Sequence, residues 1–369
     1  ERPMWFALDG EKAEYEYSYN YQNWYPSAEY ETNNTIKNVG LFDLTPFSKF
    51  EIVSDKAHQE LQKICTANIK DEIGKCTYTH MLNSDGGIET DLTVVCLKKN
   101  HFRIISSAET RERDKFHIKK HLPEEIKLKD VTDDLCVFGL FGPKSRDLIK
   151  TISKDNFEND NFKFGTAKFI TIEGVKVWIQ RLSYVGELGY ELYVEFKDAK
   201  RLYELIVNKG KDFNLSNCGM HAMDIMRMES GFLHWGHDIS PEENQYQAGL
   251  SFTISHKKDV DFIGRQALEK IKKEKLKSRF AMFILKDSKP GIPLLLHDEP
   301  IYLEDKIIGR TTSGNYSFNY DKNLSFGYIS SNLSNEELQN KKLFIEVEKQ
   351  KYAANILLKP LKDTRFKVI

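Results

Sequence analysis

A polar turn that runs directly into a β-branched strand is the feature that most constrains this chain. Residues 82–95 read LNSDGGIETDLTVV, so Asn, Ser, Asp and two glycines precede an apolar segment. Glycine and Asn supply the positive φ angles and side-chain-to-backbone bonds of a tight turn, and residues 92–97 predict a buried strand. Asp91 is therefore expected at the junction between a turn and a strand.

Asp91 has two interpretations at this junction. A carboxylate that enters an apolar strand is costly to bury unless hydrogen-bond donors, a cation or a ligand compensate its charge. Turn aspartates that cap their own backbone are commoner than functional ones, so the local pattern alone favours the structural role.

The length and composition indicate a folded protein of two or three domains. A chain of 369 residues exceeds what one hydrophobic core usually serves, and 40% hydrophobic, 30% charged and 12% aromatic residues give no sign of disorder. The net charge is −1, with 54 basic and 55 acidic residues interleaved, which argues against a nucleic-acid partner. No apolar run of about 18 residues predicts a membrane span.

The cysteines indicate a reducing compartment. They are five in number, widely spaced and mostly set in apolar runs, and no CxxC pair occurs, so reduced core residues are expected and neither a structural zinc nor a redox dithiol. The N-terminus lacks a signal-peptide pattern. We therefore expect a cytoplasmic protein, or one of the mitochondrial matrix if it is eukaryotic. The first residue, Glu1, is compatible with a processed chain or a part of a longer one.

Hydrophobic periodicity predicts a mixed α+β chain. The first 30 residues are rich in aromatic side chains and are expected to wrap a larger body. Strands are expected at 39–44, 49–53, 102–106, 135–140, 175–179 and 190–194, and helices at about 55–68, 110–121, 145–152, 197–208, 218–229 and 261–277. From Arg279 onward, short strands punctuated by Gly and Asn predict a C-terminal β-barrel or sandwich, with a tight polar turn at 309–314.

Two further motifs each have a structural and a functional interpretation. The run HWGHD at 234–238 offers two histidines without a third ligand, so local hydrogen bonding is favoured over a metal site. Cys218 and His221 share a predicted apolar helix, so inert packing is favoured over a thiol nucleophile. No dinucleotide fingerprint, P-loop, HExxH or GxSxG motif occurs, so no FAD or NAD site is expected in this chain.

Four motifs resemble the tetrahydrofolate-dependent aminomethyltransferase family, which includes the glycine cleavage T-protein. GGIETDL at 86–92 is similar to the family's GGxxxDL, YVGELGYEL at 184–192 to GYTGExGxE, FGP at 141–143 to QGP, and GRTTSG at 309–314 to VTSG. The chain more closely resembles the folate-binding half of dimethylglycine and sarcosine dehydrogenases. The segments that carry this closer resemblance are 1–6, 23–25, 40–43, 227–229, 234–239 and 261–265.

The resemblance implies a three-domain T-protein-like fold around a central folate channel, with a C-terminal β-barrel. The implied domains are a discontinuous folate-binding domain of residues 1–50 and 134–250, an α+β domain of 51–133 that carries the Asp91 turn, a helical linker of 251–278 and a barrel of 279–369.

The resemblance also implies a site. Asp91 becomes the catalytic carboxylate beside the reacting folate amine, and Tyr78, Tyr184 and Glu191 become contacts of the pterin. Ser107 takes the place of an asparagine near the pterin. Met223 stands where the T-protein has an arginine, so that folate contact is absent.

The implied activity is tetrahydrofolate-dependent one-carbon transfer, which forms 5,10-methylenetetrahydrofolate from the methylene or iminium unit of an N-methyl amine or aminomethyl donor. Two alternatives stay open: direct methyl transfer from a sulfonium or quaternary amine, and a folate-binding module without turnover. The motif of an iron-sulphur-linked relative of this fold is absent, which disfavours the module. The expected partners are folate, a small N-methyl or S-methyl donor and an FAD-dependent dehydrogenase domain or subunit, with no metal, nucleic acid or membrane.

Overall fold

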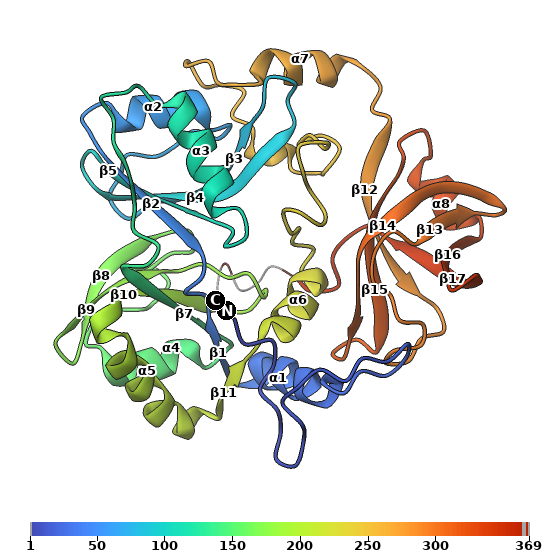
Figure 1. The fold of residues 1–369 in the computed structure, drawn as a ribbon, viewed down its shortest axis with the longest axis horizontal. Coiled ribbons are helices and arrows are strands. Elements are labelled where there is room, and N and C mark those ends of the chain that lie inside the picture. Colours follow the sequence, from blue (N-terminus) through green and yellow to red (C-terminus); the bar gives the residue numbers. More distant parts are fainter. Residues whose placement is uncertain (1, 364–366, 368–369) are drawn as a thin grey trace.

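Three β-sheets organise the computed structural model, which describes residues 2–363 and 367 (Figure 1). A six-stranded sheet, a five-stranded sheet and a closed six-stranded barrel are connected and flanked by helices. The predicted α+β composition and the C-terminal barrel are confirmed. The predicted domain boundaries stay a prediction. The outer ends of the first and last predicted domains lie outside the described residues, namely Glu1, 364–366, 368 and 369.

The six-stranded sheet has the order β11-β1-β7-β10-β9-β8. Its strands are β1 Val39–Asp43, β7 Leu135–Phe141, β8 Ala167–Ile172, β9 Val175–Gln180, β10 Gly189–Glu195 and β11 Leu215–Cys218. Helices α4 (Ser145–Ile152) and α5 (Phe196–Gly210) contribute to the core on one face, where Leu192 and Val194 of β10 lie. Because side chains alternate along a strand, Glu191 and Tyr193 face the opposite side.

The five-stranded sheet has the order β3-β4-β5-β2-β6 and carries Asp91. Its strands are β2 Ser48–Val53, β3 Cys76–Leu82, β4 Ile88–Lys98, β5 His101–Ser106 and β6 Leu128–Asp130. Leu92 and Val94 pack with helices α2 (Ala57–Ile64) and α3 (Arg111–His121). Val95, on the other face, joins a core shared with the six-stranded sheet, and the alternation places Asp91 on that face too.

The predicted turn before Asp91 forms as its composition suggests. Asn83 Oδ1 accepts hydrogen bonds from the backbone N–H groups of Asp85 and Gly87, at 3.0 and 2.9 Å. Gly86 has φ +85°, and a Cβ on Gly87 would lie 2.0 Å from the carbonyl oxygen of Pro241, so both positions require glycine. The strand begins at Ile88, earlier than the predicted residue 92, so Asp91 lies inside β4 and not at its junction with the turn.

The barrel consists of β12 Ser278–Leu285, β13 Pro300–Leu303, β14 Lys306–Ser317, β15 Lys322–Ser330, β16 Leu343–Val347 and β17 Gln350–Leu357. Helix α8 (Asn335–Asn340) packs beside it. The prediction of a tight turn at 309–314 is wrong, because these residues lie within β14. The β14–β15 register shifts between Thr311 and Ser313, and such an irregularity uses the small polar residues that sequence patterns associate with turns.

Other helix boundaries also differ from the predictions. Cys218 ends β11, and α6 starts at Met220, so the thiol is not on the predicted helix. Helix α2 starts at Ala57, because Ser54 Oγ accepts a hydrogen bond from the backbone N–H of Lys56 and stabilises a turn before the helix. Helix α7 is confined to Arg265–Lys273. No helix in the described part of the chain is long and apolar enough to cross a membrane.

The aromatic N-terminal segment wraps the body of the protein, as expected. It reaches α1 (Tyr25–Lys37) without a regular element of its own. The backbone N–H groups of Met220 and His221, at the start of α6, donate to the carbonyls of Pro3 and Met4, at 3.0 Å each.

Candidate functional site

Asp91 is a mostly buried carboxylate whose charge has little compensation. It lies opposite His80 of β3, and its Oδ1 is 3.7 Å from His80 Nε2. Its side chain is 17% exposed, and Oδ1 is buried with no hydrogen-bond partner among the described residues. Burial raises the pKa of Asp91 to about 7, while the nearby Tyr78 hydroxyl acts in the opposite direction. A carboxyl with such a pKa can accept or release a proton near neutral pH.

A second buried carboxyl lies near Asp91, and sequence reasoning missed it. Asp114 of α3 is 1% exposed, and its Oδ2 accepts a hydrogen bond from Thr110 Oγ at 2.6 Å. Burial raises the pKa of Asp114 to about 6, and its charge contributes to the raised pKa of Asp91. Because Asp114 stands in a highly charged helical segment, the sequence offered no signal that separated it from a solvated helix face.

Tyr78 lies on β3, two residues before His80 and on the same strand face. Its hydroxyl is 3.3 Å from His80 Nε2. The residue is 40% exposed, yet burial of the hydroxyl, and then the charge of Asp91, raise its pKa well above the ordinary value. A side chain that is both accessible and desolvated has protein on most sides and solvent on one, as expected in the wall of a concave site.

Tyr184 approaches the same place from the loop before β10. Its hydroxyl donates to the carbonyl of Leu233 at 2.9 Å, and its ring stacks on Phe232 with 5.9 Å between centroids. Burial raises the pKa of Tyr184, and the charge of Asp91 adds to that rise. The structure therefore brings Tyr78, Asp91 and Tyr184 within electrostatic reach of one another.

Glu191 lies in the wall between the two open sheets. It is 8% exposed, and its Oε2 accepts hydrogen bonds from Gln180 Nε2 at 3.0 Å and Tyr193 Oη at 2.8 Å. Burial raises its pKa. Cys76 of β3 donates through Sγ to Gln180 Oε1 at 3.8 Å, so this polar group borders the strand that carries Tyr78 and His80. No direct contact joins Glu191 to Asp91.

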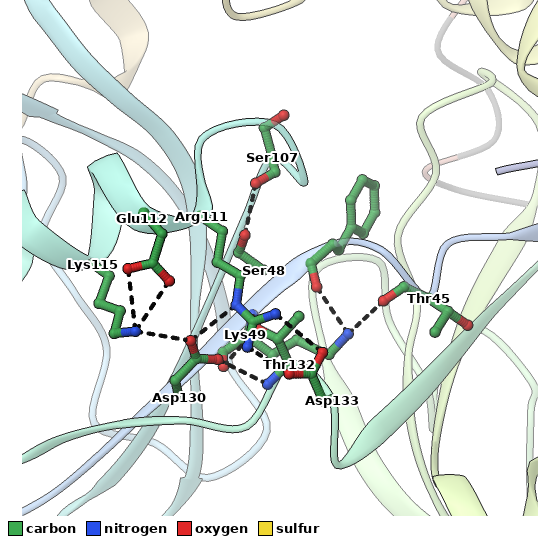
Figure 2. Close-up of polar contacts among 11 residues, drawn as sticks. Thr45, Ser48, Lys49, Ser107, Arg111, Glu112, Lys115, Asp130, Thr132 and Asp133 are labelled. Atoms are coloured by element: carbon green, nitrogen blue, oxygen red, sulfur yellow. Dashed lines mark hydrogen bonds and ion pairs between the residues drawn. The ribbon is translucent and has the colours of Figure 1, made fainter. Parts of the chain in front are cut away.

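Ser107 lies just beyond β5, at the edge of the group. Its carbonyl accepts the hydroxyl of Ser48 at 2.8 Å (Figure 2). Among the described residues, no hydrogen bond joins its own hydroxyl to Asp91 or to the other predicted pterin contacts, so the structure does not tie Ser107 to the cluster by a hydrogen bond.

The motif around 234–238 forms a structural joint. Arg227 of α6 (Met220–Glu229) is 2% exposed and donates to Asp224 Oδ1 at 2.7 Å, Asp238 Oδ2 at 2.5 Å and Ser313 Oγ at 2.9 Å. Asp238 Oδ1 accepts the hydroxyls of Thr312 and Ser313, at 2.6 and 2.8 Å. Three sequence motifs thus meet between α6, the 234–239 loop and the barrel. The described residues contain no group of three His, Cys, Asp or Glu side chains that could hold a metal.

The thiol of Cys218 is in an inert environment. Its Sγ lies 3.4 Å from the hydroxyls of both Thr35 and Ser216, and burial raises its pKa to about 12. His221 instead stacks on Trp24, with ring centroids 4.9 Å apart. Because thiolate is the nucleophilic form, this arrangement favours packing over nucleophilic chemistry.

A second buried polar joint lies between β1 and β2. Lys49 Nζ donates to the carbonyls of Thr45 and Phe47 at 2.7 and 2.8 Å, and burial lowers its pKa to about 8 (Figure 2). Beside it, Arg111 is bound to Asp130 and Asp133. These contacts hold the connection between the two open sheets.

Comparisons with known proteins agree with this architecture. Residues 1–258 match the model of the GCVT N-terminal domain, and residues 279–363 match that of the glycine cleavage T-protein C-terminal barrel domain. An aminomethyltransferase of Halothermothrix orenii is 32% identical over 301 residues, which are 81% of this chain and 82% of that protein. The mitochondrial dimethylglycine dehydrogenase of Rattus norvegicus is 32% identical over 366 residues, which are 98% of this chain and 42% of that protein.

A solved structure shows the same fold. The glycine cleavage system aminomethyltransferase T of Bartonella henselae superposes with a TM-score of 0.80 at 20% sequence identity, and the match covers 94% of each chain. The predicted T-protein-like fold is thereby confirmed. The chain spans less than half the length of the dehydrogenase it resembles.

Proposed function

Because the chain belongs to the glycine cleavage T-protein family, we propose that it transfers a one-carbon unit to tetrahydrofolate, with Asp91 as the catalytic carboxylate. The observation that supports this most is the environment of Asp91. A buried carboxylate oxygen without a hydrogen-bond partner lies close enough to Tyr78 and Tyr184 for the Asp91 charge to raise the pKa of both hydroxyls. Such an oxygen is costly to desolvate unless a ligand provides the missing donor.

The side chains near Asp91 fit a folate. The rings of Tyr78 and Tyr184 can line the flat faces of a pterin, and the Glu191 carboxylate can accept hydrogen bonds from a pterin amino group and ring N–H. Ser107, at the edge, is the weakest of the proposed contacts, because nothing in its position commits the hydroxyl to the site. Tetrahydrofolate would supply the amine that receives the one-carbon unit.

Asp91 has the properties that the transfer requires. An amine that attacks a methylene or iminium carbon develops positive charge and must lose a proton. The ionised Asp91 carboxylate can stabilise that charge and take up the proton at Oδ1, and a pKa of about 7 allows the carboxyl to release it afterwards. Partial burial strengthens this electrostatic interaction.

We further propose that the one-carbon unit comes from an N-methyl amine and forms 5,10-methylenetetrahydrofolate. The similarity to dimethylglycine dehydrogenase over 98% of this chain supports this donor class. An FAD-dependent dehydrogenase domain or subunit would oxidise the amine before the transfer. Reaction in one protein-walled site would limit escape of formaldehyde and orient the two reactants.

The test supplies tetrahydrofolate with formaldehyde or an iminium donor and identifies the product by mass spectrometry. After subtraction of the uncatalysed rate, the wild type should form 5,10-methylenetetrahydrofolate, and Asp91→Asn should be about 10² to 10⁴ times slower. Asp85→Asn, on the exposed turn next to the site, is the matched control and should retain the wild-type rate. Equal rates for Asp91→Asn and the wild type would disprove the catalytic role. Formation of 5-methyltetrahydrofolate in a parallel assay, with a sulfonium or quaternary-amine methyl donor in place of formaldehyde, would identify a methyl transferase instead.

A further inference from the structure

Arg113 lies on α3 and binds the start of the strand that carries Asp91. Its Nη1 donates to the carbonyl of Glu89 at 2.7 Å, and its Nη2 pairs with the Glu89 carboxylate. Arg113 therefore binds both the main chain and the side chain of one residue. Glu89 and Asp91 are two residues apart on β4, so their side chains lie on the same face of the strand.

The first residues of β4 have a neighbouring strand on one side. The ladder with β3 extends to the pair Leu82–Ile88, whereas β5 ends at Ser106, opposite Leu92. In the described ladders, residues 88–91 therefore extend past β5 and pair with β3 alone. A stretch that is bonded on one side opens more readily than the interior of a sheet, so additional contacts decide how firmly it is held.

The indole of Trp235 joins this contact from the 234–239 loop. The Arg113 Cζ lies 4.5 Å from the centroid of the Trp235 ring, and Trp235 Nε1 donates to the carbonyl of Ile88 at 3.1 Å. A guanidinium is planar and presents several N–H donors, so it can stack on a ring and bind two acceptors at once. One guanidinium thus connects α3, the start of β4 and the 234–239 loop.

The alternative interpretation is a solvated ion pair, because the Arg113 side chain is 37% exposed. Exposed pairs that make a single contact contribute little. The Glu89 carboxylate is 19% exposed, however, and its second oxygen accepts Asn83 Nδ2 at 3.3 Å. Asn83 also forms the glycine turn before Asp91. The pair is therefore fixed at both ends by contacts that a solvated ion pair lacks.

We propose that Arg113 is a positioning residue that fixes the first residues of β4 and thereby the place of the Asp91 carboxylate relative to the reacting amine. The proposal rests on the proposed function and adds a residue to it. Arg113 exchanges no proton and forms no bond with the substrate. It acts through Ile88 and Glu89, which precede Asp91 by three and two residues. A shift of about 1 Å in a catalytic group can cost a large factor in rate, so loosening this segment should lower kcat.

Hydrogen–deuterium exchange of the intact protein tests the positioning role without turnover. In Arg113→Met, the backbone amides of residues 83–91 should exchange about tenfold faster than in the wild type. Residues 92–95 pair with both β3 and β5, so their amides should keep the wild-type rate. Unchanged exchange at 83–91 would overturn the proposal.

Arg265→Met is the matched control for this measurement. Arg265 likewise pairs with a glutamate, donates to a backbone carbonyl and lies over an aromatic ring, with its side chain 24% exposed. These contacts lie within residues 256–269 and not on β4. Exchange at 83–91 should therefore stay at the wild-type rate. Acceleration there by Arg265→Met equal to that by Arg113→Met would also overturn the proposal.

Steady-state kinetics separate positioning from binding and from charge. Arg113→Met should lower kcat about tenfold and change the KM for tetrahydrofolate by less than about twofold. A raised KM with the wild-type kcat would mean that Arg113 contacts folate, and the proposal would be wrong. Arg113→Lys keeps the charge but cannot bind two acceptors in a fixed geometry, so its kcat should be intermediate. Burial raises the pKa of Asp114 and the Arg113 charge opposes that rise, so full recovery in Arg113→Lys would identify charge as the cause and overturn the positional role.

A double-mutant cycle with Trp235→Phe tests whether the two side chains act on one segment. Trp235→Phe keeps an aromatic ring and removes the donor to Ile88. The effects of Arg113→Met and Trp235→Phe on the logarithm of kcat should sum to more than the effect of the double variant, and full additivity would contradict a shared segment. If the wild type makes no product but Arg113→Met accelerates exchange at 83–91, only the proposed function fails. If the wild type is active and exchange is unchanged, only the positioning role fails.

Discussion

Two buried aspartates, Asp91 and Asp238, show how the same side chain is used in different ways in one molecule. Asp238 is 1% exposed, and both of its oxygens are occupied: Oδ2 by Arg227 and the backbone N–H of His234, and Oδ1 by two hydroxyls of the barrel. Asp91 has an oxygen with no partner and a pKa raised to about 7. A carboxylate whose two oxygens both accept hydrogen bonds stabilises the fold, whereas a carboxylate with an unpaired oxygen can still bind a ligand.

Loss of the buried ion pair between Arg227 and Asp238 should have the largest effect on stability. Arg227→Met leaves the buried Asp238 carboxylate without its cation, so we expect the free energy of unfolding to fall by about 3–5 kcal/mol. Urea unfolding followed by circular dichroism measures this loss.

Arg111→Met is the matched control for that measurement. Arg111 also binds two aspartates, but its side chain is 31% exposed and Asp133 is 80% exposed (Figure 2). The expected loss is about 1 kcal/mol or less, because solvent screens such pairs. A loss for Arg227→Met no larger than that for Arg111→Met would show that the buried network does not hold the joint.

Asp91→Asn should act on stability in the opposite direction. Folding raises the pKa of Asp91 from 3.8 to about 7, so ionisation of this group penalises the folded state from about pH 4 upward, and the penalty reaches its full size above about pH 7. This penalty is absent below the unfolded pKa and grows as the pH rises. We expect Asp91→Asn to be more stable than the wild type by on the order of 1 kcal/mol near pH 8, with the gain vanishing toward pH 4.

Asp238→Asn provides the comparison for this effect. Because it breaks a satisfied pair with Arg227, it should be destabilising throughout this pH range. If Asp91→Asn and Asp238→Asn lose similar stability near pH 8, the two carboxylates do not differ in the way the structure indicates.

The smallest expected effect is that of Asp114, the second buried carboxyl, on the pKa of Asp91. Asp114→Asn removes a negative charge that raises the pKa of Asp91, and the amide oxygen can still accept the Thr110 hydroxyl. The midpoint of the pH–rate profile should therefore fall by about half a unit. Glu112→Gln, an exposed change on the same helix, should leave it in place. A midpoint that rises in Asp114→Asn would show that the charge of Asp114 does not raise the pKa of Asp91.

The sequence predicted much of the fold because hydrophobic period and turn composition are local. Helix α4 begins and ends at the predicted residues, and the glycine turn before Asp91 forms as its composition suggests. The polar run at 309–314 was misread as a turn because a register shift inside a strand uses the same small residues.

The site was only partly predictable, since its members come together through tertiary packing. Asp91, Tyr78 and Tyr184 were proposed from the family resemblance, and the structure places them near one another. His80 and Asp114 were not named, because their relevance depends on a cross-strand pairing and on a helix that lies over a sheet face. Sequence spacing encodes neither of these relations.

A ¹³C NMR titration of the Asp91 carboxyl in the intact protein, with and without tetrahydrofolate, tests whether Asp91 is the catalytic carboxylate. We expect a midpoint near pH 7 in the free protein and a clear displacement of that midpoint when folate binds. A carboxyl that titrates near its ordinary value of 3.8 and does not respond to folate would contradict it.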